Sequence, residues 1–194
     1  MDKKTILKDG TQVAIRRFRS GDIDKLMRFY RSLPLEDRKY LKFDVTKKRI
    51  VLQRIRKLEA GEMARIVALH KGRIIADGVL EFSADQWSRH QAEILLIIAP
   101  SFRQKGLGTL MIRELFCRAL QKKVEVIVAR MMGPQVGSQK IFHKLGFREQ
   151  GLLSEHVKDS EGAAQDLIIM ACDVKDLMKE LELLYQYEDW QRCR

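Results

Sequence analysis

The sequence predicts a mixed α/β domain, and the prediction rests on the order of its strand and helix patterns. Three strand patterns follow one another between residues 63 and 99. A helix, a strand and a second helix then alternate over residues 108–145, and a final hairpin is indicated at 147–171. Successive strands followed by interleaved helices are typical of a layered α/β architecture. At 194 residues the chain suits one domain with a full hydrophobic core.

The first sixty residues predict a hairpin followed by three helices. The Asp9-Gly10 pair is a hairpin turn signal. Ser20 can cap the first helix, and Pro34 can begin the second. The expected segments are strands at 5–7 and 11–18 and helices at 20–32, from 34 onward, and at 46–58.

The rest of the chain predicts alternating strands and helices up to about residue 171. Lys71-Gly72 indicates a tight turn between two strand patterns, and the segment 159–162 indicates another. The expected strands lie at 63–69, 73–82, 93–99, 124–129, 147–157 and 164–171, and the expected helices at 108–122 and 135–145.

A strand, a glycine turn and a helix follow one another directly after residue 93. The apolar run Ile94–Ala99 is long enough for one buried strand, and Pro100 ends it because proline has no N–H for the ladder. Gly106 and Gly108 then allow a sharp turn. Apolar residues at helical spacing follow, at Ile112, Leu115, Phe116 and Ala119. Free amides and a helix dipole would therefore converge on one point, which suits a phosphate or pyrophosphate.

The glycine loop differs from two common phosphate-binding motifs. Met111 occupies the position of the third glycine of a dinucleotide fingerprint, where helix and strand must approach closely. No Gly-Lys-Ser/Thr follows the glycines, as a Walker loop requires. Both of these nucleotide-binding classes are therefore excluded.

The loop and a second motif together resemble one enzyme superfamily. The pattern Arg-x-x-Gly-x-Gly over Arg103–Gly108, after a strand ending in Ile-x-Pro, resembles the acetyl-CoA loop of the GNAT acetyltransferases. About thirty residues later, Gln135–Phe147 ends in Phe-His-Lys-Leu-Gly-Phe, which is similar to the second GNAT cofactor motif. The resemblance covers about residues 11–173. It implies a GNAT fold for residues 1–173, with a central, mostly antiparallel sheet and helices on both faces.

The same resemblance implies acetyl-CoA as co-substrate and assigns residues to it. A strand-edge amide near Ile98 would polarise the thioester, where the two central strands of the family separate. Gln135 stands where the family often has asparagine, and Ser138 where it often has alanine. The residues that we expect to bind the cofactor are Ile98, Arg103, Gln104, Lys105, Gly106, Leu107, Gly108, Thr109, Gln135, Ser138 and Phe142.

Transfer to an amine requires a base, because a free lysine amine has a pKa of about 10.4. Glu93 resembles in position the glutamate base of GNAT protein-lysine acetyltransferases, and Glu81 on the preceding strand is the alternative. The family places a tyrosine at the position of Phe142, where it protonates the departing thiolate. Phenylalanine has no proton to give, so we expect water or the new ammonium to do so.

The segment 31–43 indicates the class of acceptor. Its sequence, Arg-Ser-Leu-Pro-Leu-Glu-Asp-Arg-Lys-Tyr-Leu-Lys-Phe, is similar to a segment of bacterial protein-lysine acetyltransferases that modify acyl-CoA synthetases. In the family this region forms one wall of the acceptor groove. A protein lysine is therefore the favoured acceptor. Two alternatives stay open: a small-molecule amine, and a CoA-binding regulatory module without turnover, which Phe142 would favour.

The formal net charge of +11 has two interpretations. The first is a solvated basic surface, such as the helix face containing Arg54, Arg56 and Lys57. The second is an acidic protein substrate or an RNA-associated partner. No basic stripe interleaved with aromatic residues supports nucleic-acid readout, so we do not expect a nucleic-acid ligand.

Composition favours a cytoplasmic protein. No apolar run approaches the roughly 18 residues that a membrane span needs, and the N-terminus lacks the core of a signal peptide. The cysteines have neither the spacing of a disulfide framework nor that of a metal site, and Cys117 and Cys172 are expected to be buried, reduced thiols. The scattered histidines predict no metal.

Residues 174–194 predict a helical extension to the domain. Its apolar stripe consists of Val174, Leu177, Met178, Leu181, Leu184 and Tyr185. This stripe either packs on its own domain or forms a contact in a homodimer.

Overall fold

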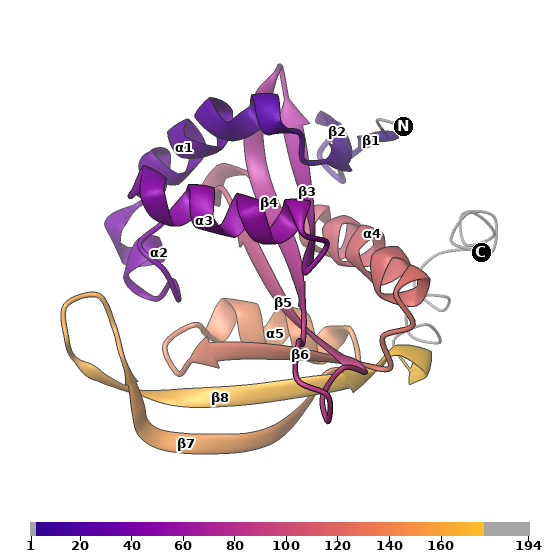
Figure 1. Cartoon of the computed structure of the whole chain (residues 1–194). Helices are drawn as coiled ribbons and strands as arrows, with labels where there is room; N and C mark the ends of the chain where they lie inside the picture. Colours follow the sequence, from indigo (N-terminus) through magenta and orange to yellow (C-terminus); the bar gives the residue numbers. More distant parts are fainter. Residues whose placement is uncertain (1–2, 177–194) are drawn as a thin grey trace. The chain divides into compact units, whose positions relative to one another are not determined.

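The structure of the chain is a computed structural model that describes residues 3–176 (Figure 1). The strands are β1 Lys3–Ile6, β2 Gln12–Arg17, β3 Met63–His70, β4 Arg73–Phe82, β5 Gln91–Ile98, β6 Val126–Met132, β7 Arg148–Lys158 and β8 Ala164–Asp173. The helices are α1 Ile23–Ser32, α2 Leu35–Lys39, α3 Lys48–Glu59, α4 Leu107–Gln121 and α5 Val136–Lys144, with the 3-10 turns η1 Ser20–Asp22 and η2 Pro100–Phe102.

The predicted mixed α/β fold is confirmed. Within residues 3–176, eight strands form one sheet in the order β1-β2-β3-β4-β5-β6-β8-β7. Strands β5 and β6 pair in parallel, whereas β1 with β2, β2 with β3, β6 with β8, and β7 with β8 pair antiparallel. The sheet is therefore mostly antiparallel, as the resemblance implied.

The predicted elements up to β8 are present, with shifts at their ends, and the largest shift is in β6. Its prediction at 124–129 was wrong at both ends. The Val124 amide instead donates to the Ala119 carbonyl at 3.0 Å and closes the end of α4. Lys123 makes this turn with a φ of +56°. β6 then continues to Met132 because it pairs with β8 along its whole length.

The described residues group into two compact units. The first unit consists of the described residues up to Val79 together with Leu95–Leu115. The second consists of Leu80–Ile94 and the described residues from Phe116 onward. Strands β4 and β5 and helix α4 each begin in one unit and end in the other.

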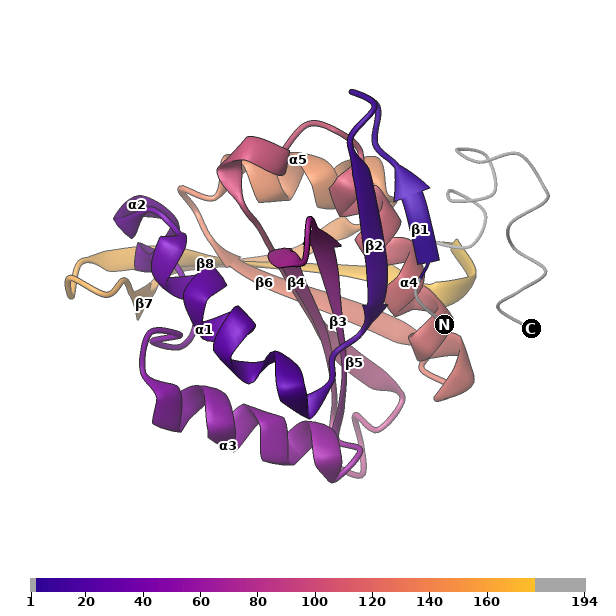
Figure 2. The same ribbon diagram turned by 90° about the horizontal axis from the view of Figure 1, so that it is seen from above.

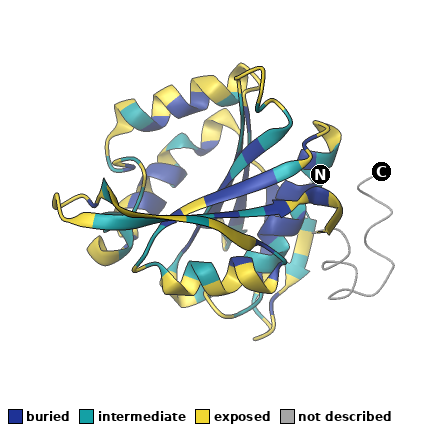
Figure 3. Cartoon of the chain, turned by 90° about the horizontal axis from the view of Figure 1, so that it is seen from below, coloured by how far each residue is buried: buried dark blue, intermediate teal, exposed yellow. Residues whose placement is uncertain are grey.

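In the first unit, helices α1 and α3 cover one side of the strands, and the first half of α4 lies on the other (Figure 2). Apolar residues of α1 recur at helical spacing and face the strands, while charged positions face solvent. Figure 3 shows the same division, with buried residues along the strands and exposed residues on the outer sides of the helices. The buried cluster consists of Phe18, Leu26, Met27, Phe29, Tyr30, Leu33, Val45, Val51, Ile55, Val67, Ile74 and Ile97.

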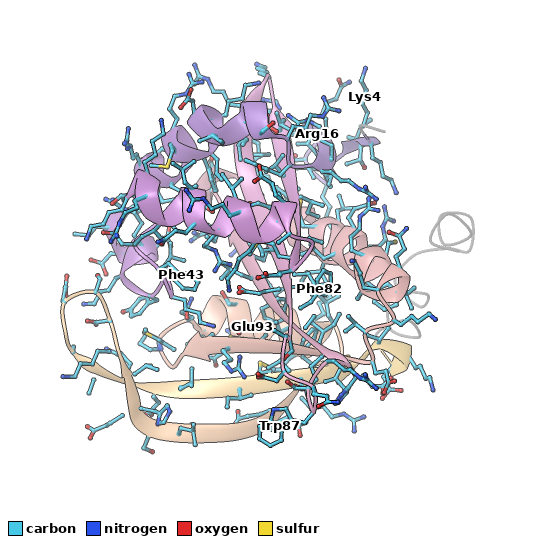
Figure 4. All side chains as sticks on the ribbon, viewed as in Figure 1. Lys4, Arg16, Phe43, Phe82, Trp87 and Glu93 are labelled. Carbon is cyan, nitrogen blue, oxygen red and sulfur yellow. The ribbon has the colours of Figure 1, made fainter. Side chains whose placement is uncertain are left out.

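The beginning of α1 is fixed by an ion pair rather than by the predicted Ser20 cap. Asp22 accepts two hydrogen bonds from Arg16, at 2.6 and 2.7 Å, and a third from the Arg19 amide at 3.0 Å. The Arg16 hydrogen bonds lower the pKa of Asp22. The pair therefore ties the last residues of β2 to the turn that precedes α1 (Figure 4 labels Arg16).

A buried polar network joins α1 to β3 and β4. The Tyr30 hydroxyl donates to Asp77 at 2.6 Å, and Arg65 donates two hydrogen bonds to the same carboxylate, at 2.8 and 2.9 Å. Arg65 also donates to the Tyr30 oxygen. Each of the three residues is at most 3% exposed. Burial and the neighbouring Asp77 charge raise the pKa of Tyr30. Burial alone would lower the pKa of Arg65, but the Asp77 charge outweighs burial and raises it.

The second unit is built on β6, β8 and β7. β8 pairs with β6 in unbroken register, whereas its pairing with β7 is interrupted twice, between Glu149 and Gly151 and between Leu153 and Val157. Most of β7 is exposed, including Leu152 and Leu153. Such interruptions are typical of sheet edges.

Two sequence interpretations need correction. Arg54 does not belong to a solvated helix face, because it is 8% exposed and its guanidinium carbon lies 4.3 Å from the centre of the Phe43 ring. Cys117 is half-buried, whereas the sequence predicted a buried thiol. Cys172 is a free, buried cysteine, as predicted.

Three further observations concern the described part of the chain. None of its helices has the length and apolar character needed to cross a membrane. Residues 3–176 contain no group of three or more His, Cys, Asp or Glu that could hold a metal ion. The predicted extension at 174–194 lies almost entirely outside the described residues.

The buried network yields a prediction about stability. The change Asp77→Asn should lower the free energy of unfolding by about 3–5 kcal/mol, because it leaves the Arg65 charge buried without its anion. Tyr30→Phe should cost about 2 kcal/mol, since it removes hydrogen bonds to charged groups. Urea titration followed by circular dichroism measures both. Asp44→Asn is the control, because its exposed pair with Lys47 is worth less than about 1 kcal/mol. Equal unfolding midpoints for Asp77→Asn and this control would contradict the prediction.

Asp9 in the first hairpin gives a prediction about pH. Hydrogen bonds from Lys105 and from the Thr11 amide lower the pKa of Asp9 from 3.8 to about 2. A carboxylate with a lowered pKa contributes stability above its unfolded pKa and loses that contribution as the pH falls. The contribution of Asp9 should therefore be complete above about pH 4 and lost on acidification toward pH 2.

Carboxyl-carbon NMR titration measures this directly. In Lys105→Gln the pKa of Asp9 should rise toward 3.8, since the largest cause of its shift is removed. Lys8→Gln, a neighbouring lysine without that contact, should leave it at about 2. An unchanged Asp9 titration in Lys105→Gln would show that the ion pair does not form.

Candidate active site

Short-range contacts in the first unit shape the chain between β5 and α4. β5 ends at Ile98, and Pro100–Phe102 then form the 3-10 turn η2. The Arg103 Nε donates to the Ile98 carbonyl oxygen at 3.0 Å, and Arg103 Nη2 lies 2.8 Å from Asp37 Oδ2. Arg103 therefore holds the loop to the strand that precedes it and links it to α2.

The loop presents consecutive backbone amides at the beginning of α4. Gly106 has a φ of +85°, in the left-handed region that favours glycine. Leu110 N donates to the Gly106 carbonyl at 3.2 Å and closes the first turn of the helix. The amides of Gly106, Leu107, Gly108 and Thr109 have no acceptor among residues 3–176. Four such donors at the start of a 15-residue helix suit an anion.

The N-terminal hairpin supports the loop. Lys8 N donates to the Lys105 carbonyl at 3.2 Å, and Lys105 Nζ lies 2.8 Å from Asp9 Oδ2. Gln104, which precedes Lys105 in the chain, has a φ of +60°, which is uncommon for a residue with a side chain. The charge of Lys105 is therefore directed at Asp9 in this structure.

Two glycines allow α4 to lie close to the strands of the first unit. A Cβ added at Gly108 would lie 3.3 Å from Ile98 Cδ1, and one added at Gly78 would lie 3.1 Å from Leu115 Cδ1 and 3.2 Å from Met111 Cε. The close approach that a dinucleotide fold obtains from a helix glycine comes here from Gly78 on β4. Sequence reasoning missed this role, because Gly78 stands inside an ordinary strand pattern.

In the second unit, the remaining residues that the sequence predicted to bind the cofactor lie in α5 or directly before it. Gln135 precedes the helix, and its side-chain oxygen accepts from the Met132 amide at 2.8 Å. Ser138 is partly exposed in the first turn, and its amide donates to the Gln135 carbonyl at 2.9 Å. Phe142 is 7% exposed and meets the Phe147 ring edge-on, with centroids 4.9 Å apart. Phe142 therefore serves as packing within its own unit.

Glu93 forms an ion pair in the second unit. Its Oε2 accepts a hydrogen bond from Arg130 Nη1 at 2.7 Å, and the two side chains are 22% and 44% exposed (Figure 4). The parallel ladder between β5 and β6 ends at Glu93 and Val128. Glu81, the alternative base, is partly buried near the end of β4. Glu93 is therefore a carboxylate at the end of a ladder, with a cation held against it.

The structure assembles the predicted residues into two local sets. In the first unit it brings together Ile98 and the loop residues 103–109, and in the second it places Gln135, Ser138 and Phe142 along α5. Arg130 was not predicted. Its only sequence signal is its place in the strand after α4. It lies two residues beyond Val128, the residue that pairs with Glu93, and this relation can be recognised only when the register of β5 and β6 is known.

Comparison with known proteins agrees with this geometry. The family model described as "Acetyltransferase (GNAT) family" matches residues 25–147. No curated protein matches the chain in sequence.

Solved structures share the fold at low sequence identity. RimJ from Mycobacterium smegmatis, in complex with CoA-disulfide, is 17% identical with a TM-score of 0.76, and the match covers 94% of this chain and 93% of that one. A phosphinothricin acetyltransferase from Sinorhizobium meliloti, in complex with acetyl-CoA, is 21% identical with a TM-score of 0.72, covering 83% and 88%. The GNAT domain of S. lividans PAT is 15% identical with a TM-score of 0.71, covering 89% and 96%.

The family match covers more than half of the chain, and the fold agrees with it. The chain therefore belongs to the GNAT family of acetyltransferases, as an acyl-CoA-dependent N-acetyltransferase with acetyl-CoA as its co-substrate.

Proposed function

We propose that this acetyltransferase modifies a lysine side chain of a protein, with Glu93 as the general base. The observation that carries the cofactor half of the proposal is the group of four amides without acceptors at the start of α4. Such a group can bind an anion, and the pyrophosphate of CoA supplies one. Arg103, Gln104 and Lys105 complete this phosphate-binding loop.

We assign the rest of the cofactor to residues of both motifs. The backbone near Ile98 would orient the thioester carbonyl and stabilise the oxyanion that develops on it. Gln135 and Ser138 would contact the cofactor from the beginning of α5. Phe142 contributes an apolar surface, because its ring is held by Phe147 and carries no proton.

The proposed chemistry balances without a tyrosine. Glu93 removes one proton from the acceptor ammonium, directly or through one water. The amine nitrogen then bonds to the acetyl carbon as the carbon–sulfur bond breaks, and CoA leaves as a thiolate. A thiolate with an ordinary pKa of about 8.5 is a tolerable leaving group, and water or the new ammonium returns its proton.

The choice of a protein lysine rests on the segment 31–43 and on its position. This segment ends α1, contains α2, and is joined to the cofactor loop through the pair of Asp37 with Arg103. A small-molecule amine is the second candidate, because one structural relative is a phosphinothricin acetyltransferase. An acceptor screen that includes lysine peptides, polyamines and amino sugars separates the two.

We also propose an organisation for the whole chain. Residues 1–173 would form the acetyltransferase domain, and 174–194 an extension that packs on it or joins two copies. The composition supports a cytoplasmic location. Sedimentation of the chain with and without residues 177–194 tests the dimer, since only a dimer contact would make the mass depend on the extension.

The loop assignment predicts the effect of Gly106→Trp. An indole at this position, where φ is +85° and an added Cβ would lie 3.6 Å from the Lys8 side chain, should fill and strain the turn. It should therefore abolish acetyl-CoA binding, which calorimetric titration measures. Gly162→Trp is the matched control, because Gly162 also has a positive φ, of +88°, but lies in the β7–β8 turn. Circular dichroism verifies that both variants fold. Unchanged affinity in a folded Gly106→Trp would refute the assignment.

The assignment of the base predicts a separation of binding from turnover. Glu93→Gln should keep its affinity for acetyl-CoA while kcat falls by about 10²–10⁴-fold at neutral pH, which is the usual contribution of a general base. CoA release measured with a thiol reagent gives the rate. Glu81→Gln should retain turnover. If Glu81→Gln is the variant that loses activity, the base is Glu81 instead.

A further inference from the structure

The charge of the chain is distributed unevenly between its two units. Residues 1–79 and 95–115 contain 24 Lys and Arg against 11 Asp and Glu. Residues 80–94 and 116–194 contain 13 against 15. The whole excess of positive charge therefore belongs to the first unit, and a phosphate loop with Arg103 and Lys105 accounts for only a small part of it.

Helix α3 exposes much of this charge on one side. Lys48, Leu52 and Arg56 are spaced four residues apart, and Arg49, Gln53 and Lys57 form a parallel row beside them; all six are exposed. We call these six residues the basic face of α3. Its rows extend for about 12 Å along the helix. No acidic residue occurs between positions 48 and 58.

The opposite side of α3 fixes the orientation of this face. Val51 and Ile55 are buried in the core of the first unit, and Arg54 is buried against the Phe43 ring. Asp24 lies 4.0 Å from Lys48, but both side chains are more than half exposed, so this pair screens little of the charge. The basic face is therefore held outward by packing on three neighbouring positions.

The composition of the face favours an acidic polypeptide over RNA. Leu52 is 36% exposed at its centre, with cations on the helix turns before and after it. An apolar side chain between cations suits an acidic segment that also carries an apolar residue. The six positions include no aromatic ring on which a base could stack, and stacking is the usual means of holding single-stranded RNA.

We propose that the basic face of α3 docks an acidic segment of the acceptor protein, so that the enzyme acts on lysines whose protein carries such a segment nearby. This inference rests on the proposed function, since it names the class of protein whose lysine is acetylated. Attraction between opposite charges raises the rate of encounter and selects the partner. The acceptor ammonium would then be delivered by a partner that carries a negatively charged segment nearby.

The kinetic test compares two peptides that contain one lysine each. One carries an acidic stretch with a central leucine, and in the other every Asp and Glu is replaced by Asn or Gln. The double variant Arg49→Glu/Arg56→Glu should raise KM for the acidic peptide about tenfold at low salt and leave kcat unchanged, because it removes binding and not chemistry. Added salt should weaken the wild-type preference.

The matched control is Arg148→Glu/Lys158→Glu on β7. It changes the net charge by the same amount at exposed positions of the second unit, so it should leave both KM values unchanged. Arg49→Gln/Arg56→Gln removes the two charges without adding new ones, so it separates loss of charge from any disturbance of the helix by the reversed pair. It should show about half of the effect on KM. Equal KM values for the two peptides with wild-type enzyme would overturn the proposal.

Binding without turnover separates this proposal from the proposed function. Fluorescence anisotropy measures binding of the acidic peptide with its lysine replaced by norleucine. If the variant Arg49→Glu/Arg56→Glu loses binding of this peptide, the docking face is supported. If the wild-type enzyme acetylates neither lysine peptide, the lysine acceptor is refuted, whatever the result for binding. Equal acetylation and equal binding of both peptides would refute the face alone. Tighter binding of a single-stranded RNA of the same charge would also overturn the proposal.

Discussion

The first unit depends on a carboxylate that has no access to water. Asp77 lies inside the sheet, and burying a charge there is costly unless it is paired and hydrogen-bonded. Arg65 on the next strand and Tyr30 on α1 meet that requirement together. The Tyr30 hydroxyl contacts both Asp77 and Arg65, so it holds α1 against β3 and β4. Helices α2 and α3 follow α1 in the chain, so the network also limits where the segment 31–43 can lie.

The loop between η2 and α4 meets the opposite requirement, because the amides of Gly106, Leu107, Gly108 and Thr109 have no acceptor among residues 3–176. Its amides stay available because Gly106 turns the chain and Arg103 and Lys105 hold the loop from its two sides. Hydrogen-bonded polar groups thus fix the position of α1, whereas the loop leaves donors available. Both conditions occur within the first unit.

Much of the fold could be predicted from the sequence, including the turn and the helix that follow β5, whereas the role of residues 103–109 in binding the cofactor stays a prediction. Periodicity located the strands and helices, and the glycine loop with its second motif indicated the family. The errors have local causes. Ser20 looked like a cap, but Asp22 is drawn to Arg16. Arg54 looked like surface charge, but Phe43 stacks on it. The pairs of Glu93 with Arg130 and of Asp77 with Arg65 depend on strand register, which no local pattern encodes.

If Glu93 is the base, as we propose, its pair with Arg130 has a consequence for how an acceptor enters. A carboxylate that already holds a cation at 2.7 Å is not a bare charge waiting for an ammonium. An incoming amine has to displace the guanidinium or share the carboxylate with it, so its arrival is an exchange of counter-ions. Neutral molecules cannot make that exchange, and they would leave the Arg130 side chain in place. The pair would thus act as a filter that admits only a substrate with a positive charge of its own.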